Sequence, residues 1–362
     1  MVLMTPRERV LTAMRRQQPD RVPRRLEYGS FVTPTMKIFR RKTGANDPAE
    51  YYKYEIRDVE FHETTCLRNV NPHVIDNLPP SAYVDHEWGN VSITGYYDNI
   101  SQVLNYALAE AETAEDIEAY ILPDLLAPYR WAHIKKDTQE LHSRQFAVMG
   151  AMSQTLFEVA WGVRGFENML MDFIINPRVP TALLDRLTVM RCEQARIFAQ
   201  ADVDVLRLGD DVGTERGMMI SPLIFREWLK PRFEEIIKAA KEIKPDILIF
   251  YHSDGDCREI IPDLIDIGID ILNPVQPECM DPAEIKTQYC NKLAFWGTIG
   301  TQTTMPFGTP NDVKHEVMER ISTVGKGGGL LLAPTHMLQA EVPWENITAF
   351  FDAVDEYGEY DN

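Results

Sequence analysis

The chain has little of what holds small secreted proteins together or anchors membrane proteins. Its five cysteines are scattered, odd in number and without a C-x-x-C pair, which is not the pattern of a disulfide framework. No apolar run approaches the ~18 residues that a membrane-spanning helix needs. The N-terminal stretch lacks a long apolar core, so we expect no signal peptide. These absences predict a cytoplasmic protein that does not interact with membranes.

Positive charge is also scarce. The 37 Lys and Arg residues face 55 Asp and Glu residues, which gives a net charge of −18. Such a field repels a phosphate backbone, and the sequence has no evident basic stripe, so we expect no nucleic-acid partner. With 362 residues the chain can bury a large core, and it needs no metal or disulfide merely to fold.

The N-terminal part indicates helices and turns without a regular repeat. Thr5-Pro6-Arg7-Glu8 has the form of a capping box with proline at the first helical position, which predicts a helix from Pro6. Residues 80–105 alternate in polarity between Gly and Asn turns, which is typical of a hairpin. Polar helical segments follow as far as residue 145. Residues from about 75 to 145 are therefore predicted to elaborate a larger domain.

Short apolar runs then alternate with amphipathic helices. Apolar strands separated by helices indicate a parallel sheet covered on both faces. The repeat number, the length and the lack of a G-x-G-x-x-G motif favour a closed barrel over an open sheet. We predict an α/β protein in which residues 1–362 form one (β/α)8 TIM-type barrel domain with an N-terminal helical and hairpin elaboration. The predicted strands lie within residues 146–152, 203–208, 247–251, 269–275, 293–296 and 328–334.

Potential metal ligands stand where these runs end, which is where such barrels carry their active sites. His252, Cys279 and His336 follow three different runs, and barrel closure could bring them within a few ångströms of one another. Two imidazoles and a thiolate suit Zn²⁺, and Asp254 is a candidate fourth ligand or a residue that orients a ligand. Taken singly, each histidine is equally compatible with a structural role, and an inert thiol is the commoner fate of a free cysteine such as Cys279. Three such residues on one rim favour the metal site.

Acidic and aromatic residues complete the candidate site. Asp210 and Asp211 follow the 203–208 run, where they either cap a helix or act as a general base or ligand-orienting pair. Both interpretations stay open, and we predict catalytic roles for Asp210, Asp211 and Asp254. The candidates for apolar pocket walls, each also compatible with a core position, are Tyr28, Trp161, Trp296 and Met337.

An ordered series of motifs resembles the uroporphyrinogen decarboxylase superfamily, most closely over residues 203–350 and nearly throughout the chain. The resemblance implies a (β/α)8 barrel. It does not imply uroporphyrinogen decarboxylation, because true decarboxylases share P-x-W-x-M-R-Q-A-G-R, whose arginines hold the substrate's carboxylates, and the matching VPRRLEYGSFVTPTMKIFRRKTG lacks it. The motifs are TPRERVLTAMRRQQPDRVP, GDDVGTERGMMISPLIFREWLKP, HSDG, DILNPVQPECMDPAEIK, LAFWGTIGTQ and APTHMLQAEVPWEN.

Within that superfamily the chain is more similar to the zinc-dependent, corrinoid-linked methyltransferases. Their H-x-C pair is matched by His252 and Asp254, their last cysteine falls at or near His336, and Cys279 is an extra thiol that could replace the missing one. The resemblance implies methyl transfer between a small-molecule substrate and a corrinoid (cobalamin). Harder ligands favour a methoxy compound over a thiol. No D-x-H-x-x-G segment occurs, so the corrinoid is predicted to reside on a partner protein.

Two other functions stay open. A metal-dependent decarboxylase or lyase of a small carboxylate needs a cationic grip, and two of the candidates Arg164, Arg207 and Arg216 near the pocket would favour it. A non-catalytic small-molecule binding protein of the same fold would hold no metal, and side chains would block the rim of its barrel. A homodimer is also left open.

Overall fold

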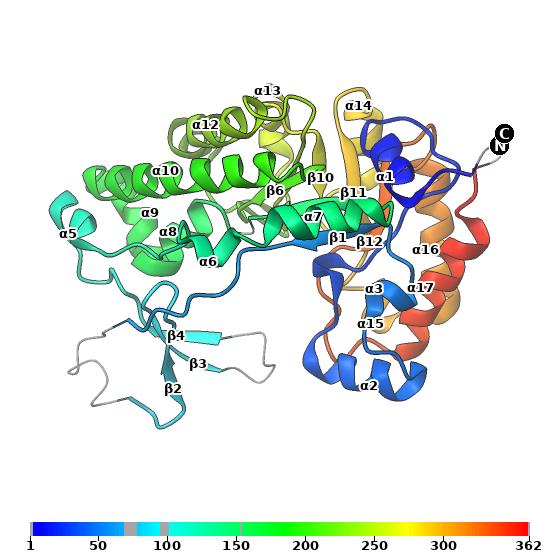
Figure 1. Ribbon diagram of the computed structural model, residues 1–362, viewed down its shortest axis with the longest axis horizontal. Helices are drawn as coiled ribbons and strands as arrows, with labels where there is room; N and C mark the ends of the chain where they lie inside the picture. The colour runs from blue at the N-terminus through cyan, green and yellow to red at the C-terminus, as the bar shows by residue number, and fades with distance from the viewer. Residues whose placement is uncertain (1–2, 69–77, 95–100, 153, 361–362) are drawn as a thin grey trace.

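A seven-stranded parallel sheet forms the centre of the computed structural model, which describes residues 3–68, 78–94, 101–152 and 154–360 (Figure 1). The sheet curls into a barrel, as predicted. All six strands expected after residue 145 are present, whereas β1 was not predicted because two of its four residues are charged. In sheet order the strands are β1 (Ile56–Val59), β5 (Ala147–Ala151), β6 (Val205–Gly209), β9 (Leu248–His252), β10 (Ile271–Asn273), β11 (Ala294–Ile299) and β12 (Leu330–Pro334).

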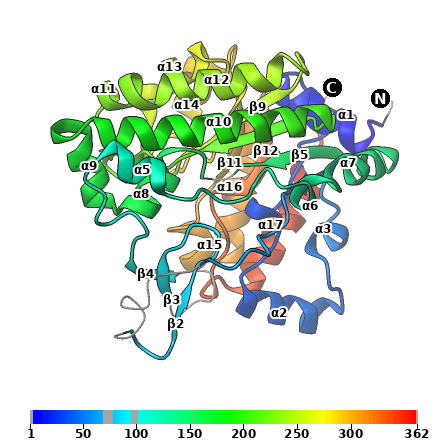
Figure 2. The ribbon, with the colours of Figure 1, turned by 60° about the vertical axis from the view of Figure 1, so that its left-hand side comes forward.

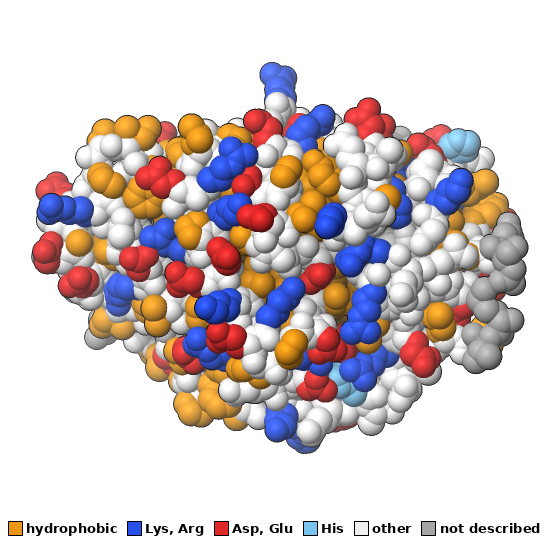
Figure 3. All heavy atoms as spheres, turned by 90° about the horizontal axis from the view of Figure 1, so that it is seen from above, with side chains coloured by type: hydrophobic (Ala, Val, Ile, Leu, Met, Phe, Trp, Pro, Cys, Tyr) orange, Lys and Arg blue, Asp and Glu red, His pale blue; other side chains and the backbone are white. Residues whose placement is uncertain are grey.

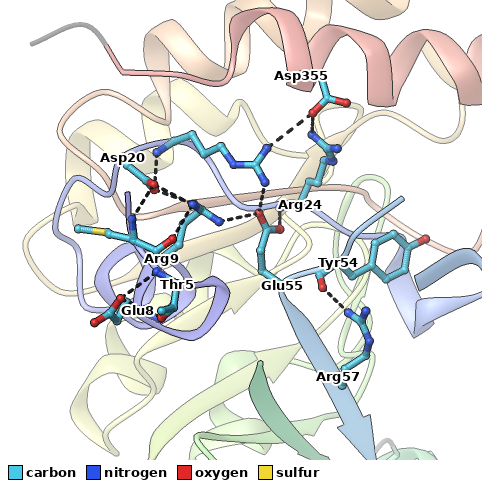
Figure 4. A network of polar contacts seen from close by, with 11 residues as sticks. Thr5, Glu8, Arg9, Asp20, Arg24, Tyr54, Glu55, Arg57 and Asp355 are labelled. Atoms are coloured by element: carbon cyan, nitrogen blue, oxygen red, sulfur yellow. Dashed lines mark hydrogen bonds and ion pairs between the residues drawn. The ribbon is translucent and has the colours of Figure 1, made fainter. Parts of the chain in front are cut away.

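An irregular extended segment, residues 23–25, occupies the eighth position of the barrel. Arg24 forms a parallel bridge with Leu332, whose N–H donates to the carbonyl of Pro23 at 2.9 Å. On the β1 side the carboxylate of Glu55 accepts the Arg24 N–H at 3.2 Å. Figure 4 shows Glu55 in one network with Arg9 and Asp20 that extends to Asp355. Buried side chains, rather than a regular ladder, thus close this edge of the barrel.

Helix α1 (Pro6–Met14) closes the amino-terminal end of the barrel. Its capping box is confirmed: the Thr5 hydroxyl accepts from the Glu8 N–H, and the Glu8 side chain accepts from the Thr5 N–H. Val10, Ala13 and Met14 pack into the barrel interior with side chains such as Phe250 and Trp296. A second hydrophobic cluster lies between the strands and the outer helices.

The outer helices surround the sheet (Figures 1 and 2). Ser221 caps a helix that runs from α11 (Pro222–Ile224) through a π-turn, Phe225–Leu229, into α12 (Lys230–Lys241). The other outer helices are α7 (Ile134–Ser143), α8 (Phe157–Arg164), α9 (Phe166–Ile175), α10 (Arg178–Gln200), α13 (Ile261–Asp266), α14 (Pro282–Tyr289), α16 (Pro310–Thr323) and α17 (Trp344–Tyr357).

Further segments leave the barrel at the carboxyl ends of its strands. The predicted hairpin region is a three-stranded antiparallel sheet of β2 (Ala82–Val84), β3 (Val91–Thr94) and β4 (Ser101–Asn105). It lies on the same side of the barrel as α2 and α15, at the bottom of Figure 1. Residues 75–77 and 95–100 of the predicted elaboration lie outside the described residues. The remaining short elements are α2 (Thr33–Thr43), α3 (Pro48–Tyr51), α5 (Ala114–Ala119), α6 (Pro128–Trp131), α15 (Thr304–Phe307), β7 (Gly213–Thr214), β8 (Gly217–Met218) and the 3-10 turns Glu27–Gly29 and Arg258–Ile260.

The surface carries mixed charge. Acidic and basic side chains are interspersed over the face in Figure 3 rather than gathered into one band of a single sign. Among the described residues no helix is long and apolar enough to cross a membrane.

Candidate functional site

Three acidic and imidazole side chains meet at the carboxyl ends of two adjacent strands. His252 is the last residue of β9, Asp254 follows it by two residues, and Asp211 follows β6. The potential ligand atoms of these three residues all lie within 4.8 Å of one another. His252 Nε2 is 3.7 Å from Asp211 Oδ1 and 3.8 Å from Asp254 Oδ1. The Asp254 N–H donates to Asp211 Oδ1 at 2.7 Å, which ties the two loops together.

The hydrogen bonds of Asn273 determine which nitrogen of His252 carries the proton. Asn273 Nδ2 donates to Glu27 Oε2 at 3.2 Å and to the Trp296 carbonyl at 3.0 Å, and both of these atoms only accept. The Asn273 Oδ1 atom therefore faces His252 Nδ1 and accepts a hydrogen bond from its N–H. The neutral imidazole then keeps a lone pair on Nε2, the atom that points at the two carboxylates. Glu27 is itself held by Arg207 Nη1 at 2.8 Å.

Two neighbouring cavities give access to this group. The inner one, of about 130 Å³, is lined by His252, Asp211 and His336, together with Tyr28, Arg207 and Glu158. The outer one, of about 200 Å³, shares His336 and is lined by Asp254 and by apolar residues including Met337 and Leu338. His336 Nε2 lies 3.9 Å from Asp254 Oδ2. Burial lowers the pKa of His336, so its imidazole is neutral and available as a ligand.

Asp210 points away from these cavities and caps a helix. Its carboxylate accepts the backbone N–H groups of Leu156, Phe157 and Glu158 at the start of α8. This is one of the two roles that the sequence left open, although the helix is α8 rather than the helix after β6. Burial raises the pKa of Asp210 to about 7, against the effect of its three backbone donors.

Glu158 lines the inner cavity and was not predicted from the sequence. Its Oε2 accepts the Asp211 N–H at 3.0 Å. Burial, reinforced by Asp211 and Asp210, raises the pKa of Glu158 to about 9, so this carboxyl group is protonated at neutral pH. A glutamate is common in the first turn of a helix because its charge interacts favourably with the helix dipole. The sequence alone therefore does not indicate that Glu158 lines a functional site.

Cys279 lies apart from the three-residue group. Its sulfur is 3.7 Å from Gln276 Oε1, and among the residues that the structure describes it does not belong to the set of ligand atoms within 4.8 Å of one another. Burial raises the pKa of its thiol to about 11, which opposes the thiolate form that a metal requires. The structure thus brings together His252, Asp254 and Asp211, with His336 beside them, but not Cys279.

The remaining candidates from the sequence, which are the proposed pocket-wall residues and the three arginines, divide into those that line a cavity of the site and those that do not. Tyr28 lines the inner cavity and Met337 the outer one, whereas Trp296 is buried inside the barrel. Trp161 packs edge-on against Phe166, and neither tryptophan lines a cavity of the site. Of the three arginine candidates only Arg207 lines the inner cavity; Arg164 pairs with Asp172, and Arg216 is exposed near the β7–β8 turn.

The group at the strand ends fits a divalent cation. Asp254 Oδ1 is buried and has no hydrogen-bond partner among the described residues, although it lies 3.8 Å from His252 Nε2. An uncompensated buried carboxylate oxygen is costly, and a cation between these atoms would satisfy it. One imidazole and two carboxylates are ligands that Zn²⁺ accepts in proteins, with a second imidazole available from His336.

Comparison with known proteins defines the class of this barrel. The sequence model of the uroporphyrinogen decarboxylase (URO-D) family matches residues 103–357. The chain therefore belongs to the uroporphyrinogen decarboxylase family, which confirms the resemblance found in its motifs.

Individual relatives are distant. The chain is 20% identical over 259 residues to uroporphyrinogen decarboxylase 2 of Arabidopsis thaliana, covering 70% of this chain and 62% of the relative. It is 21% identical over 252 residues to the corresponding protein of Oryza sativa, covering 68% and 61%. The match thus spans about three fifths of the length of these curated relatives. Among solved structures, a methyltransferase from Methanosarcina mazei superposes with a TM-score of 0.70 at 19% identity over 98% of this chain and 99% of that one, which establishes the shared fold.

Proposed function

We propose that this protein is a zinc-dependent methyltransferase that moves a methyl group between a small molecule and a corrinoid carried by a partner protein. The observation that carries the proposal is the convergence of His252, Asp211 and Asp254 at the walls of two neighbouring cavities. The whole-chain structural similarity to a methyltransferase supports it as well.

The proposed ligands differ in part from those predicted from the sequence. His252 and His336 are retained, as is Asp254, the candidate fourth ligand, and Asp211 takes the place of Cys279. A bound Zn²⁺ supplies Lewis-acid chemistry that stabilises negative charge on the heteroatom that gains or loses the methyl group. Two carboxylates make the ligand set hard, which favours an oxygen atom at that position, as in a methoxy compound.

The chain's own residues hold the ligands and restrict the substrate. Asn273 and Glu27 fix the tautomer of His252, and the Asp254 N–H orients Asp211. The inner cavity of about 130 Å³ admits only a small group of the substrate. Met337 and Leu338 form an apolar wall in the outer cavity, beside the part of the substrate that remains outside the inner one. In the decarboxylase motif P-x-W-x-M-R-Q-A-G-R the first arginine stands five residues after the proline. Counted from Pro23, that position is occupied by Tyr28 in this chain.

A metal-dependent lyase of a small carboxylate is the second candidate, and one observation favours it. Arg207 lines the inner cavity, and its Nε and Nη2 atoms have no hydrogen-bond partner in the described part of the chain. A carboxylate grip of two cations is not available there, since Arg164 and Arg216 lie elsewhere. We therefore place methyl transfer first.

The test is methyl transfer by the zinc-loaded protein between methoxy or thiol compounds and free cob(I)alamin or methylcobalamin. We expect turnover with an oxygen substrate, and its loss in His252→Ala. His315→Ala, an exposed histidine on α16, is the matched control and should retain activity. Release of CO₂ from a carboxylate without any change in the cobalamin spectrum would favour the lyase instead.

A further inference from the structure

Tyr28 occupies an unusual backbone conformation at the wall of the inner cavity. Its φ and ψ are 56° and 12°, in the left-handed region that side-chain-bearing residues seldom adopt. Gly29 follows with a φ of 72°. The residues that lead into the turn are held by the bidentate Arg25–Asp58 pair and by Glu27, which accepts from Arg207 and Asn273. Such strain persists only where the surroundings impose it, and it is frequent at functional sites.

The side chain of Tyr28 is fixed between the groups of the site. The guanidinium carbon of Arg207 lies 4.4 Å from the ring centroid. The ring meets His336 edge-on at 5.4 Å and His252 at 6.1 Å between centroids. Its hydroxyl oxygen is 3.4 Å from His252 Nε2. In the neutral imidazole whose Nδ1 donates to Asn273, Nε2 has the lone pair and the phenol is the donor.

We propose that the Tyr28 hydroxyl is a functional hydrogen-bond donor of this site and that it changes its acceptor when a metal binds. In the metal-free protein it donates to the lone pair of His252 Nε2 and so competes with the metal for that atom. Once the metal takes the lone pair, the hydroxyl stays in the cavity and donates to the heteroatom of the bound substrate. Only this second step rests on the proposed function; the competition requires nothing but metal binding.

The first step is tested with Zn²⁺ alone, titrated into metal-free wild type, Tyr28→Phe and Tyr54→Phe in competition with a chromophoric chelator. Tyr54 is the control because its buried hydroxyl has no partner among the described residues and it precedes β1, at the opposite end of the barrel. We expect Tyr28→Phe to bind Zn²⁺ about threefold to tenfold more tightly than wild type, the range for loss of one competing hydrogen bond. Tyr54→Phe should match wild type. A tyrosine difference spectrum should accompany binding in wild type and in Tyr54→Phe, and be absent in Tyr28→Phe.

The second step is tested on the cobalt-substituted protein, whose ligand-field absorption reports an added ligand. With methanol as the oxygen probe, Tyr28→Phe should lose about tenfold in affinity, whereas ethanethiol, whose sulfur is a weak hydrogen-bond acceptor, should bind wild type and variant equally.

The outcomes separate the two proposals. Zn²⁺ binding that Tyr28→Phe leaves unchanged or weakens would overturn the role of Tyr28 alone. An equal loss of affinity for methanol and for ethanethiol would show a general disturbance of the site and would also overturn it. Failure of wild type and both variants to bind Zn²⁺ would overturn the proposed function, and this role of Tyr28 with it.

Discussion

The imidazole of His252 and the amide of Asn273 form a buried hydrogen-bonded pair at the ends of the adjacent strands β9 and β10. Asn273 is fully buried, and Glu27 and the Trp296 carbonyl occupy its two N–H groups. Its oxygen therefore cannot exchange places with its nitrogen without two repulsive contacts. The pair presents one defined nitrogen of His252 to the cavity.

Replacing Asn273 by leucine should weaken Zn²⁺ binding by about tenfold to a hundredfold, the usual effect of removing a residue that orients a ligand. The imidazole would lose the acceptor of its Nδ1 proton and could present the wrong tautomer. Zn²⁺ titration is the measurement, and circular dichroism controls for folding. An affinity equal to that of wild type would contradict the orienting role.

Asp210→Ala should destabilise the fold by about 2 kcal/mol or more, because three backbone N–H groups at the start of α8 lose their acceptor. Asp210→Asn keeps one acceptor oxygen and should cost less. Urea unfolding measures both. Zn²⁺ affinity should stay near wild type in the folded variants, and its loss in a stable Asp210→Asn protein would instead favour the ligand-orienting role left open by the sequence.

Glu27→Gln should destabilise the protein by roughly 3 kcal/mol, because Arg207 would remain charged and buried without its counter-ion. The double variant Glu27→Gln, Arg207→Met removes both charges and should recover part of that loss. Urea unfolding of the wild type, the two single variants and the double variant gives the coupling between the two residues. Strictly additive losses would mean that the pair contributes no coupling.

Cys279→Ser should retain the Zn²⁺ content and affinity of wild type, because the sulfur contacts Gln276 and burial raises the pKa of its thiol to about 11. The sequence predicted the opposite, that Cys279 is a ligand. Metal analysis of the purified variant decides between them. Loss of stoichiometric zinc would restore Cys279 to the ligand set.

The sequence predicted the barrel because its strands from residue 146 onward are buried apolar runs, and periodicity detects such runs well. It could not predict β1, where Arg57 and Asp58 interrupt the apolar pattern, or the segment at residues 23–25, which closes the barrel mainly through its arginines. The same logic located His252 and Asp254, since His252 ends a strand that was correctly predicted and Asp254 follows it by two residues.

The remainder of the site depends on loop geometry that a pattern of residue types does not contain. Strand β10 ends at Asn273, whereas the predicted run extends to residue 275. The turn that follows Asn273 places Cys279 apart from the three-residue group. Tyr28, which the sequence offered only as a candidate for the pocket wall, reaches the cavity from a strained turn. Glu158 reaches it from a helix start, which has no signature of chemistry in the sequence.

The most direct test of the account is the zinc content of the protein, measured by elemental analysis in wild type beside His252→Ala, Asp254→Ala and His315→Ala. We predict one equivalent of zinc in wild type and in the His315→Ala control, and its loss in the two site variants while they remain folded. Wild-type protein that is folded, purified without chelators, and neither contains nor takes up zinc would contradict the proposed metal centre.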